Sequence, residues 1–273
     1  LEKKYIMIKK GVELFDISGK TALITGATGY LGSVMAATLA EAGAYVLVNS
    51  RSKKRSIALV EKLVDSGYLA KEAVFDVTKK NAVAQFFDDN DELQLDILIN
   101  NAYLGDAGSI EHSETKAYVK SYEISVLASH NLLKYALPNL RKGVLQNGDA
   151  SVINITSMYG MVSPDQRIYK DIKSINPPFY GASKAALLQW TRYAACEFGP
   201  ECIRVNSISP GAFPSLLVQE NDPDFITRLS RKVPLGRVGI AAELKGPVLF
   251  LASEASSYVN GSNIIVDGGW TCW

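Results

Sequence analysis

The chain has 273 residues, 47% hydrophobic and 21% charged, and its formal net charge of +1 offers no field that would attract nucleic acid or an anionic membrane. No apolar run is long enough to span a membrane, and the N-terminal LEKKYIMIKK is too short and too charged for a signal peptide, so we expect a cytoplasmic protein. Three cysteines and two histidines form no metal-binding pattern, so we expect no metal.

Short β-branched runs alternate with longer helical segments along the chain. The predicted strands cover residues 21–26, 44–50, 72–77, 95–102, 151–157, 203–211 and 263–269. The predicted helices cover residues 33–44 (stopped by Gly43), 54–67, 81–91, 121–140, 180–198 and 242–253. Strands that are apolar on both faces and followed by helices indicate a parallel sheet covered on both sides. The pattern predicts one doubly wound, Rossmann-type α/β domain over residues 1–273, with residues 1–14 as an N-terminal extension.

The segment TGATGYLG lies between the first predicted strand and the first predicted helix. In doubly wound folds this turn receives the pyrophosphate of a dinucleotide. Glycines allow a sharp bend and a close backbone approach, and the helix N-terminus presents free N–H groups to the anion. Such loops also occur as plain tight turns, so the loop alone does not decide. The cofactor-binding residues predicted here are Gly26, Thr28, Gly29, Tyr30, Leu31 and Gly32.

Tyr180 and Lys184 lie four residues apart at the start of a predicted helix, so their side chains share one face. A phenol needs a pKa about 2 units below its usual value near 10 to exchange protons readily, a shift of ~2.7 kcal/mol. An ammonium ~4 Å away supplies about that much at an effective dielectric near 20. An exposed Tyr/Lys pair is the commoner explanation of this spacing alone. Ser157 ends a predicted strand. A serine at this position can contact a substrate oxygen, or it can belong to an ordinary turn at the end of the strand.

These residues belong to a larger ordered set of motifs. From about Phe15 to the C-terminus, the chain resembles the compact, single-domain branch of the short-chain dehydrogenase/reductase family. The resemblance implies NAD(P)-dependent hydride transfer between a carbonyl and an alcohol. The motifs that carry it are DISGKTALITG, FDV, ILINNA, NITS, YGASKAA, IRVNSISPG, PLGRVG, FLASEASSYVNG and VDGGW.

The resemblance also implies roles for individual residues. Ser157 would polarise the substrate oxygen, Tyr180 would be the general acid and base, and Lys184 would bind the nicotinamide ribose and lower the Tyr180 pKa. Family members commonly form homodimers or homotetramers through the helices that begin near residues 121 and 180, so we expect a homo-oligomer. The remaining implied cofactor contacts are Asp76 and Val77 at the adenine, Asn100 at a ribose, and Ala102, Pro210, Gly211, Phe213 and Ser215.

Two positions and one segment depart from the family pattern. Tyr30 stands where compact members usually have the middle glycine, and we interpret this glycine as shifted by one residue. Ser125 occupies the position of the asparagine of the catalytic tetrad, whose backbone carbonyl anchors a water that leads to the lysine. Because a serine keeps that carbonyl, we expect activity to persist. Residues 158–179, here called the insertion, give about twice the usual spacing between the catalytic serine and tyrosine.

The insertion carries Arg167, Lys170 and Lys173, partly offset by Asp165 and Asp171. A solvated loop is the plain explanation of such a segment. The functional interpretation is a wall for a polar or anionic substrate, such as a sugar acid or a sugar phosphate, because both of its ends lie at the active site. The segment and the C-terminal VDGGWTCW are similar to gluconate dehydrogenases and flagellin-modification reductases.

The end of the second predicted strand bears on the choice of cofactor. An NAD-specific site normally presents a carboxylate there, which repels a 2′-phosphate. No carboxylate occurs between Ala44 and Val60, whereas Ser50 and Arg51 can bind a phosphate through charge-assisted bonds. We predict NADP(H), with NAD(H) as the alternative, since an arginine here can also stack on the adenine of either cofactor.

Two other functions remain open at this point. A catalytically weakened cofactor-binding regulatory protein is favoured only by Ser125. A sugar-nucleotide epimerase or dehydratase is favoured by the TGATGYLG loop and would retain its cofactor without net oxidation. In each enzymatic case the expected partner is a small-molecule substrate, with neither nucleic acid nor membrane involved.

Overall fold

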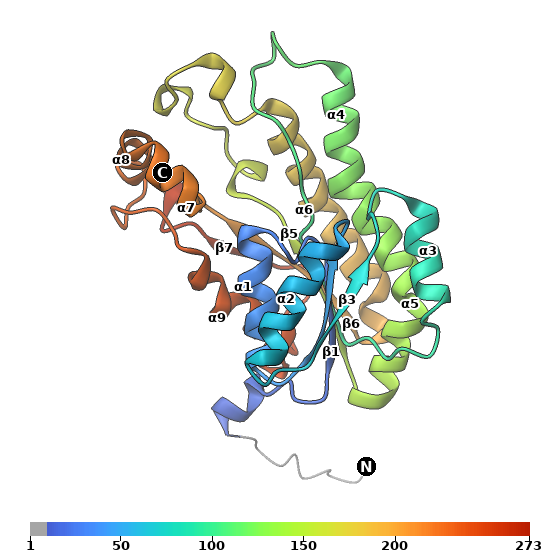
Figure 1. The fold of residues 1–273 in the computed structure, drawn as a ribbon. Helices are drawn as coiled ribbons and strands as arrows, with labels where there is room; N and C mark the ends of the chain where they lie inside the picture. Colours follow the sequence, from blue (N-terminus) through green and yellow to red (C-terminus); the bar gives the residue numbers. More distant parts are fainter. Residues whose placement is uncertain (1–9) are drawn as a thin grey trace.

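Seven parallel strands form a single sheet in a computed structural model that describes residues 10–273. Residues 1–9, part of the expected N-terminal extension, lie outside the described residues. The strand order is β3-β2-β1-β4-β5-β6-β7, so the winding reverses between β1 and β4, as the alternating pattern predicted (Figure 1). The strands are β1 (Thr21–Ile24), β2 (Tyr45–Ser50), β3 (Ala70–Val74), β4 (Ile97–Asn100), β5 (Ala150–Ile155), β6 (Ile203–Pro210) and β7 (Asn263–Val266).

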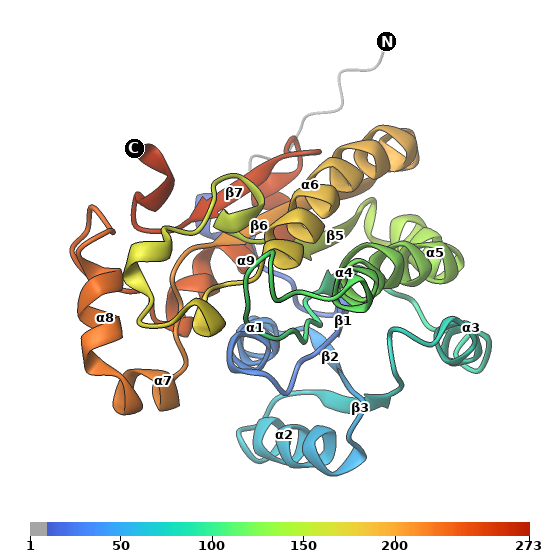
Figure 2. The same cartoon turned by 90° about the horizontal axis from the view of Figure 1, so that it is seen from above.

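Helices cover both faces of this sheet (Figure 2). Helices α1, α2 and α9 pack on one face, and α3, α5 and α6 pack on the other. None of the helices in residues 10–273 is long and apolar enough to cross a membrane. The helices are α1 (Tyr30–Glu41), α2 (Lys53–Asp65), α3 (Lys80–Asp88), α4 (Thr115–Tyr122), α5 (Ala128–Asn147), α6 (Pro178–Phe198), α7 (Leu216–Asn221), α8 (Pro223–Ser230) and α9 (Lys245–Ala252).

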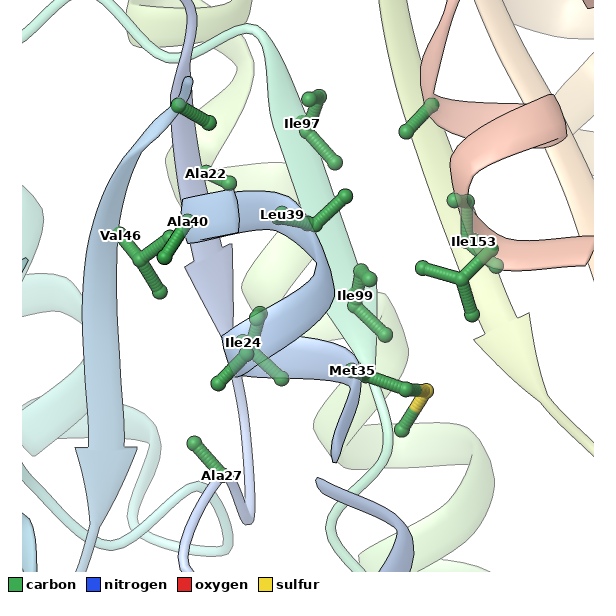
Figure 3. Packing of buried hydrophobic residues seen from close by; sticks show 14 of the residues in the cluster. Ala22, Ile24, Ala27, Met35, Leu39, Ala40, Val46, Ile97, Ile99 and Ile153 are labelled. Atoms are coloured by element: carbon green, nitrogen blue, oxygen red, sulfur yellow. The ribbon is translucent and has the colours of Figure 1, made fainter. Parts of the chain in front are cut away.

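The packing of the core explains why the sequences of the strands are continuous apolar runs. Met35 and Leu39 of α1 pack onto Ile24, Ile99 and Ile153 of three different strands (Figure 3). Every residue of β1, β4 and β5 is buried, because side chains that alternate along a strand meet helices on both sides. Burying one such Leu or Ile side chain contributes roughly 1.5–3 kcal/mol, so these faces fix the register of the central strands.

The carboxyl ends of the strands share the upper edge in Figure 1, where α4, α7, α8 and the insertion also gather. The structure differs from the expected elements at this edge. Helices α7 and α8 were not predicted. The predicted helix over residues 121–140 begins earlier, at Thr115, and passes through a π-helical turn (Glu123–Leu127) before α5. Strand β3 ends at Val74, so residues 75–77 leave the sheet and are free to line a site.

Candidate active site

A cleft of about 470 Å³ opens at the carboxyl edge of the sheet, beside the point where the winding reverses. Of the catalytic and cofactor-binding residues predicted from the sequence, all but three line it. The exceptions among residues 10–273 are Asn100, Ser125 and Ser215. Those that line it are Gly26, Thr28, Gly29, Tyr30, Leu31, Gly32, Ser50, Arg51, Asp76, Val77, Ala102, Ser157, Tyr180, Lys184, Pro210, Gly211 and Phe213.

The glycine loop is shaped so that its backbone faces the cleft. Gly26 has a φ of +61°, in the left-handed region that favours glycine. At Gly32 a Cβ atom would lie 2.3 Å from the Gly26 carbonyl oxygen, so this position has no room for a side chain. Gly29 is the N-cap of α1, and the N–H groups of the first helical turn are the ones that an α-helix leaves without intrahelical partners. This backbone cradle fits the phosphates of a dinucleotide.

The two asparagines at the end of β4 point in different directions. Asn101 donates from Nδ2 to the carbonyl oxygens of Thr25 and Gly26, at 3.0 and 3.1 Å, and so fastens the glycine loop from within the cleft. Asn100 still belongs to β4, and its Nδ2 donates to Asn154 Oδ1 at 2.8 Å. The Asn100 side chain thus bonds to β5, and the side chain that lines the cleft is that of Asn101. The contact expected between Asn100 and the ribose side of the cofactor stays a prediction.

The end of β2 forms the basic part of the cleft. The Ser50 hydroxyl accepts from the Ser52 N–H at 3.1 Å and is 2.8 Å from the Ser56 hydroxyl, which fixes its place at the start of α2. Arg51 lines the cleft as predicted, and Arg55 joins it from the first turn of α2. The sequence analysis missed Arg55, although its place at the start of the predicted helix that follows Arg51 was a usable signal.

The first turn of α6 and the end of β5 bring the predicted catalytic residues together. Lys184 is 3% exposed, and its Nζ donates to the Ile155 carbonyl oxygen at 2.8 Å and lies 5.8 Å from the centroid of the Tyr180 ring. The Ser157 hydroxyl accepts from the Tyr159 N–H at 3.1 Å. A Cβ atom at Gly181 would lie 2.6 Å from the Tyr159 carbonyl oxygen, so glycine lets the segment after Ser157 pack directly on this turn.

Burial dominates the ionisation of these groups. It raises the pKa of Tyr180 above its ordinary value, and a hydrogen bond with Ser157 offsets this only in part. It also lowers the pKa of Lys184 to about 7. Both charged forms lose hydration in the same surroundings, so burial opposes the lowering of the Tyr180 pKa that is expected from Lys184, and that lowering stays a prediction. Tyr180 is protonated at neutral pH and can act as a proton donor.

Ser125 lies behind α6 rather than in the cleft. It is buried within the π-helical turn, and its carbonyl oxygen accepts from the Ser129 hydroxyl at 2.7 Å. Its own hydroxyl lies 3.2 Å from the Ser183 hydroxyl of α6. Sequence reasoning considered only the carbonyl of Ser125, whereas the structure also joins its side chain to the helix that carries the predicted catalytic residues.

The middle of the insertion, at residues 168–170, packs against α8, whereas residues 171–174 are exposed. Tyr169 packs on Phe225, with ring centroids 5.5 Å apart. Arg228 Nε donates to the Ile168 carbonyl oxygen at 2.6 Å, and Lys170 forms an ion pair with Asp222 at 2.8 Å. The Lys170 charge is therefore shared with a carboxylate of α8 and is not free to face a substrate.

The remaining charges of the insertion are also partly neutralised. Asp165 forms ion pairs with Arg167, at 2.8 Å, and with Lys232. These cations hold the Asp165 pKa well below its usual range. Of the three cations that sequence analysis considered for an anionic substrate, two have carboxylate partners within the protein.

Comparisons with known proteins agree on one family. The family model described as enoyl-(acyl carrier protein) reductase matches residues 26–271. A rhamnolipids biosynthesis 3-oxoacyl-[acyl-carrier-protein] reductase of Pseudomonas aeruginosa is 32% identical over 94% of this chain and 98% of its own length. Gluconate 5-dehydrogenase of Gluconobacter oxydans is 31% identical over 95% of this chain and 97% of its own. The crystal structure of a gluconate 5-dehydrogenase from Burkholderia cenocepacia with NADP and tartrate is 29% identical, has a TM-score of 0.86, and is matched over 97% of this chain and 100% of that one.

Proposed function

Because the chain belongs to the short-chain dehydrogenase/reductase family and is an NAD(P)-dependent oxidoreductase, we propose that it interconverts the carbonyl and alcohol forms of a polar, sugar-acid-like substrate with NADP(H). One observation carries the proposal: Ser157, Tyr180 and Lys184 converge in a cleft that the glycine loop also lines. The gluconate 5-dehydrogenases among the relatives, and the tartrate bound to one of them, support a hydroxylated acid as the substrate class.

The chain's own residues handle the substrate oxygen and its proton. When bound, NADP(H) supplies or accepts the hydride. In reduction, the Ser157 hydroxyl donates a hydrogen bond to the substrate carbonyl oxygen, and Tyr180 gives its proton to that oxygen as the alcohol forms. In oxidation, Tyr180 takes the proton back. Lys184 has three N–H donors and uses one on Ile155, so two are left for ribose hydroxyls and for stabilising the tyrosinate.

The basic end of the cleft supports NADP(H) over NAD(H). Arg51 and Arg55 supply two guanidinium groups there, and Asp76, the acidic residue of the lining, is occupied by hydrogen bonds from Thr78. Fluorescence titration of both reduced cofactors tests the preference. We expect Arg51→Ala to weaken NADPH binding about 10- to 100-fold, from the loss of a charge-assisted bond of ~1.5–3 kcal/mol, and to leave NADH binding unchanged. Arg192→Ala, an exposed arginine on α6, is the matched control. The assignment would be contradicted if NADH bound more tightly than NADPH and Arg51→Ala left that binding unchanged.

A cofactor-oxidation screen over sugar acids, sugar phosphates, keto acids and 3-oxoacyl thioesters tests the substrate class. We expect Tyr180→Phe to lower turnover by about 10²- to 10⁴-fold, because it removes the proton donor, and to leave the NADPH dissociation constant nearly unchanged. Near-normal turnover in this variant would overturn the catalytic assignment. Turnover confined to 3-oxoacyl thioesters would replace the proposed substrate class. Net oxidation of the cofactor in the screen would also argue against the epimerase and the regulatory protein.

We also propose that the chain is one cytoplasmic folding unit that forms a homodimer or homotetramer through the α4–α6 side. The three cysteines are unpaired and exposed, as suits a reducing compartment. On the α4–α6 side, Leu127 and Tyr193 expose 45% and 69% of their surface, which favours a further contact there. Light scattering of the purified protein, with Tyr193→Glu as the disrupting variant, tests the assembly. A monomer in the wild type would refute it.

A further inference from the structure

Tyr103 lines the cleft, but the proposed reaction does not use it. It follows the NNA segment and is half-buried. Its ring meets the Tyr180 ring edge-on, with centroids 4.8 Å apart and planes at 69°. Its centroid lies 5.0 Å from Lys184 Nζ, nearer than the centroid of Tyr180 at 5.8 Å. One aromatic ring thus touches both the proposed proton donor and the buried ammonium.

The hydroxyl of Tyr103 holds this ring in place through the first turn of α6. It lies 3.0 Å from the Ser121 hydroxyl, which is 2.9 Å from the Ser183 hydroxyl and donates to the Phe179 carbonyl oxygen at 3.1 Å. Ser183 in turn donates to the Tyr180 carbonyl oxygen at 2.9 Å. Burial raises the pKa of Tyr103 to about 12, so its hydroxyl stays neutral over the working range. The ring is therefore anchored to the same helical turn that carries Tyr180.

The surroundings of Lys184 show that its buried ammonium has lost hydration, and the Tyr103 ring compensates this loss. Titratable side chains reach it from different elements: Tyr180 from α6 and Tyr103 from the segment after β4. Farther out, Tyr159 interacts electrostatically with Tyr180, and Asp106 with Tyr103. Among the ion pairs of residues 10–273 there is none between Lys184 and a carboxylate, and burial alone shifts its pKa. A buried ammonium needs compensation, and an aromatic face within about 6 Å provides it.

We propose that Tyr103 is a positioning residue whose ring keeps Lys184 charged and holds Tyr180 in its catalytic orientation. The proposal rests on the roles given to Tyr180 and Lys184 under the proposed function. The ring acts directly on the ammonium, and the hydroxyl only fixes the place of the ring. A cation over an aromatic face is stabilised in its charged form, so loss of the ring should make Lys184 lose its proton at a lower pH.

The test compares Tyr103→Leu, which removes the ring, with Tyr103→Phe, which keeps it. Two quantities are followed across pH: kcat/KM for carbonyl reduction, and the NADPH dissociation constant from fluorescence. In Tyr103→Leu we expect the alkaline limb of both profiles to move down by about 0.5–1.5 pH units. In Tyr103→Phe we expect both limbs to stay where they are in the wild type. Tyr118→Leu is the matched control, because this ring also packs on the start of α6, at Phe179, away from the ammonium.

Each outcome bears on the proposal. A uniform loss of activity in Tyr103→Leu, with unmoved pH profiles, would mean a merely structural role and overturn it. So would an equal shift in Tyr103→Phe, which would assign the effect to the hydroxyl. Should Tyr103→Leu fail to fold, Tyr103→Met gives the same comparison with a more adaptable side chain. If Tyr180→Phe keeps its turnover, the proposed function fails; if it is inactive and the Tyr103→Leu profiles do not move, this inference alone fails.

Discussion

A single methyl group at position 32 should disrupt the phosphate cradle. In Gly32→Ala the new Cβ would lie 2.3 Å from the Gly26 carbonyl oxygen, 2.9 Å from Asn101 Nδ2 and 3.0 Å from Ala27 Cα. The nearest neighbour is backbone, which cannot rotate away, so the loop itself must move. Overpacking of this kind costs ~1–3 kcal/mol, against a gain of up to ~1 kcal/mol from replacing a helical glycine. We expect a net loss of stability of up to about 2 kcal/mol.

The same substitution should also weaken cofactor binding. A displaced Gly26 carbonyl also disturbs its hydrogen bond with Asn101, so the N–H groups of the loop no longer point in the same direction. We expect the NADPH dissociation constant to rise at least tenfold, about 1.4 kcal/mol. Fluorescence titration measures binding, and urea unfolding measures stability. In the control Gly11→Ala, an added Cβ meets nothing within 4 Å, and neither quantity should change appreciably. Wild-type NADPH affinity in Gly32→Ala would refute the assignment of this loop to the phosphates.

Three further variants test separate parts of the structure. Ser125→Ala keeps the backbone carbonyl and loses only the bond to Ser183, so steady-state turnover should stay within about tenfold of wild type; a larger loss would show that the hydroxyl matters. Arg237 holds the Glu243 pKa at about 2. The Arg237–Glu243 ion pair therefore stabilises the folded state above the ordinary carboxyl pKa, and this contribution is lost as pH falls towards 2. The destabilisation by Glu243→Gln in urea should therefore shrink from pH 6 to pH 3, and a constant difference would contradict the pairing. Arg55→Ala should weaken NADPH binding about fivefold or more and spare NADH, whereas equal losses would exclude a 2′-phosphate contact.

Features that depend on one segment could be predicted from the sequence. The alternation of strands and helices follows from apolar periodicity, and the glycine loop follows from residues within eight positions of one another. Tyr180 and Lys184 share a face because helical geometry fixes the relation of residues four apart. The predicted strand over residues 72–77 was too long, because the pattern gives no sign that Phe75 leaves the sheet for the cleft.

Features that depend on distant segments could not be predicted in the same way. Lys170 meets Asp222 across 52 positions of the chain, and this pairing changes what the charge of the insertion can do. The π-helical turn at residues 123–127 contains neither glycine nor proline that would have indicated it. Tyr103 reaches α6 through Ser121, a contact that exists only once α4 is packed beside that helix.

The ionisation of the site depends on burial, which the arithmetic from spacing alone left out. That arithmetic assumed an ammonium at full charge in well-screened surroundings, close to the phenol. The structure instead buries both groups, and for each of them desolvation is the largest influence on the pKa. A protonated Tyr180 is the form that reduction needs, so burial prepares the protein to donate a proton. The weakness of this arrangement is the charge of Lys184, whose pKa of about 7 leaves it partly neutral in the working range. The pH dependence of the enzyme should therefore be set by the groups that replace the lost hydration of that ammonium, which are the Ile155 carbonyl oxygen at 2.8 Å and the Tyr103 ring, whose centroid lies 5.0 Å away.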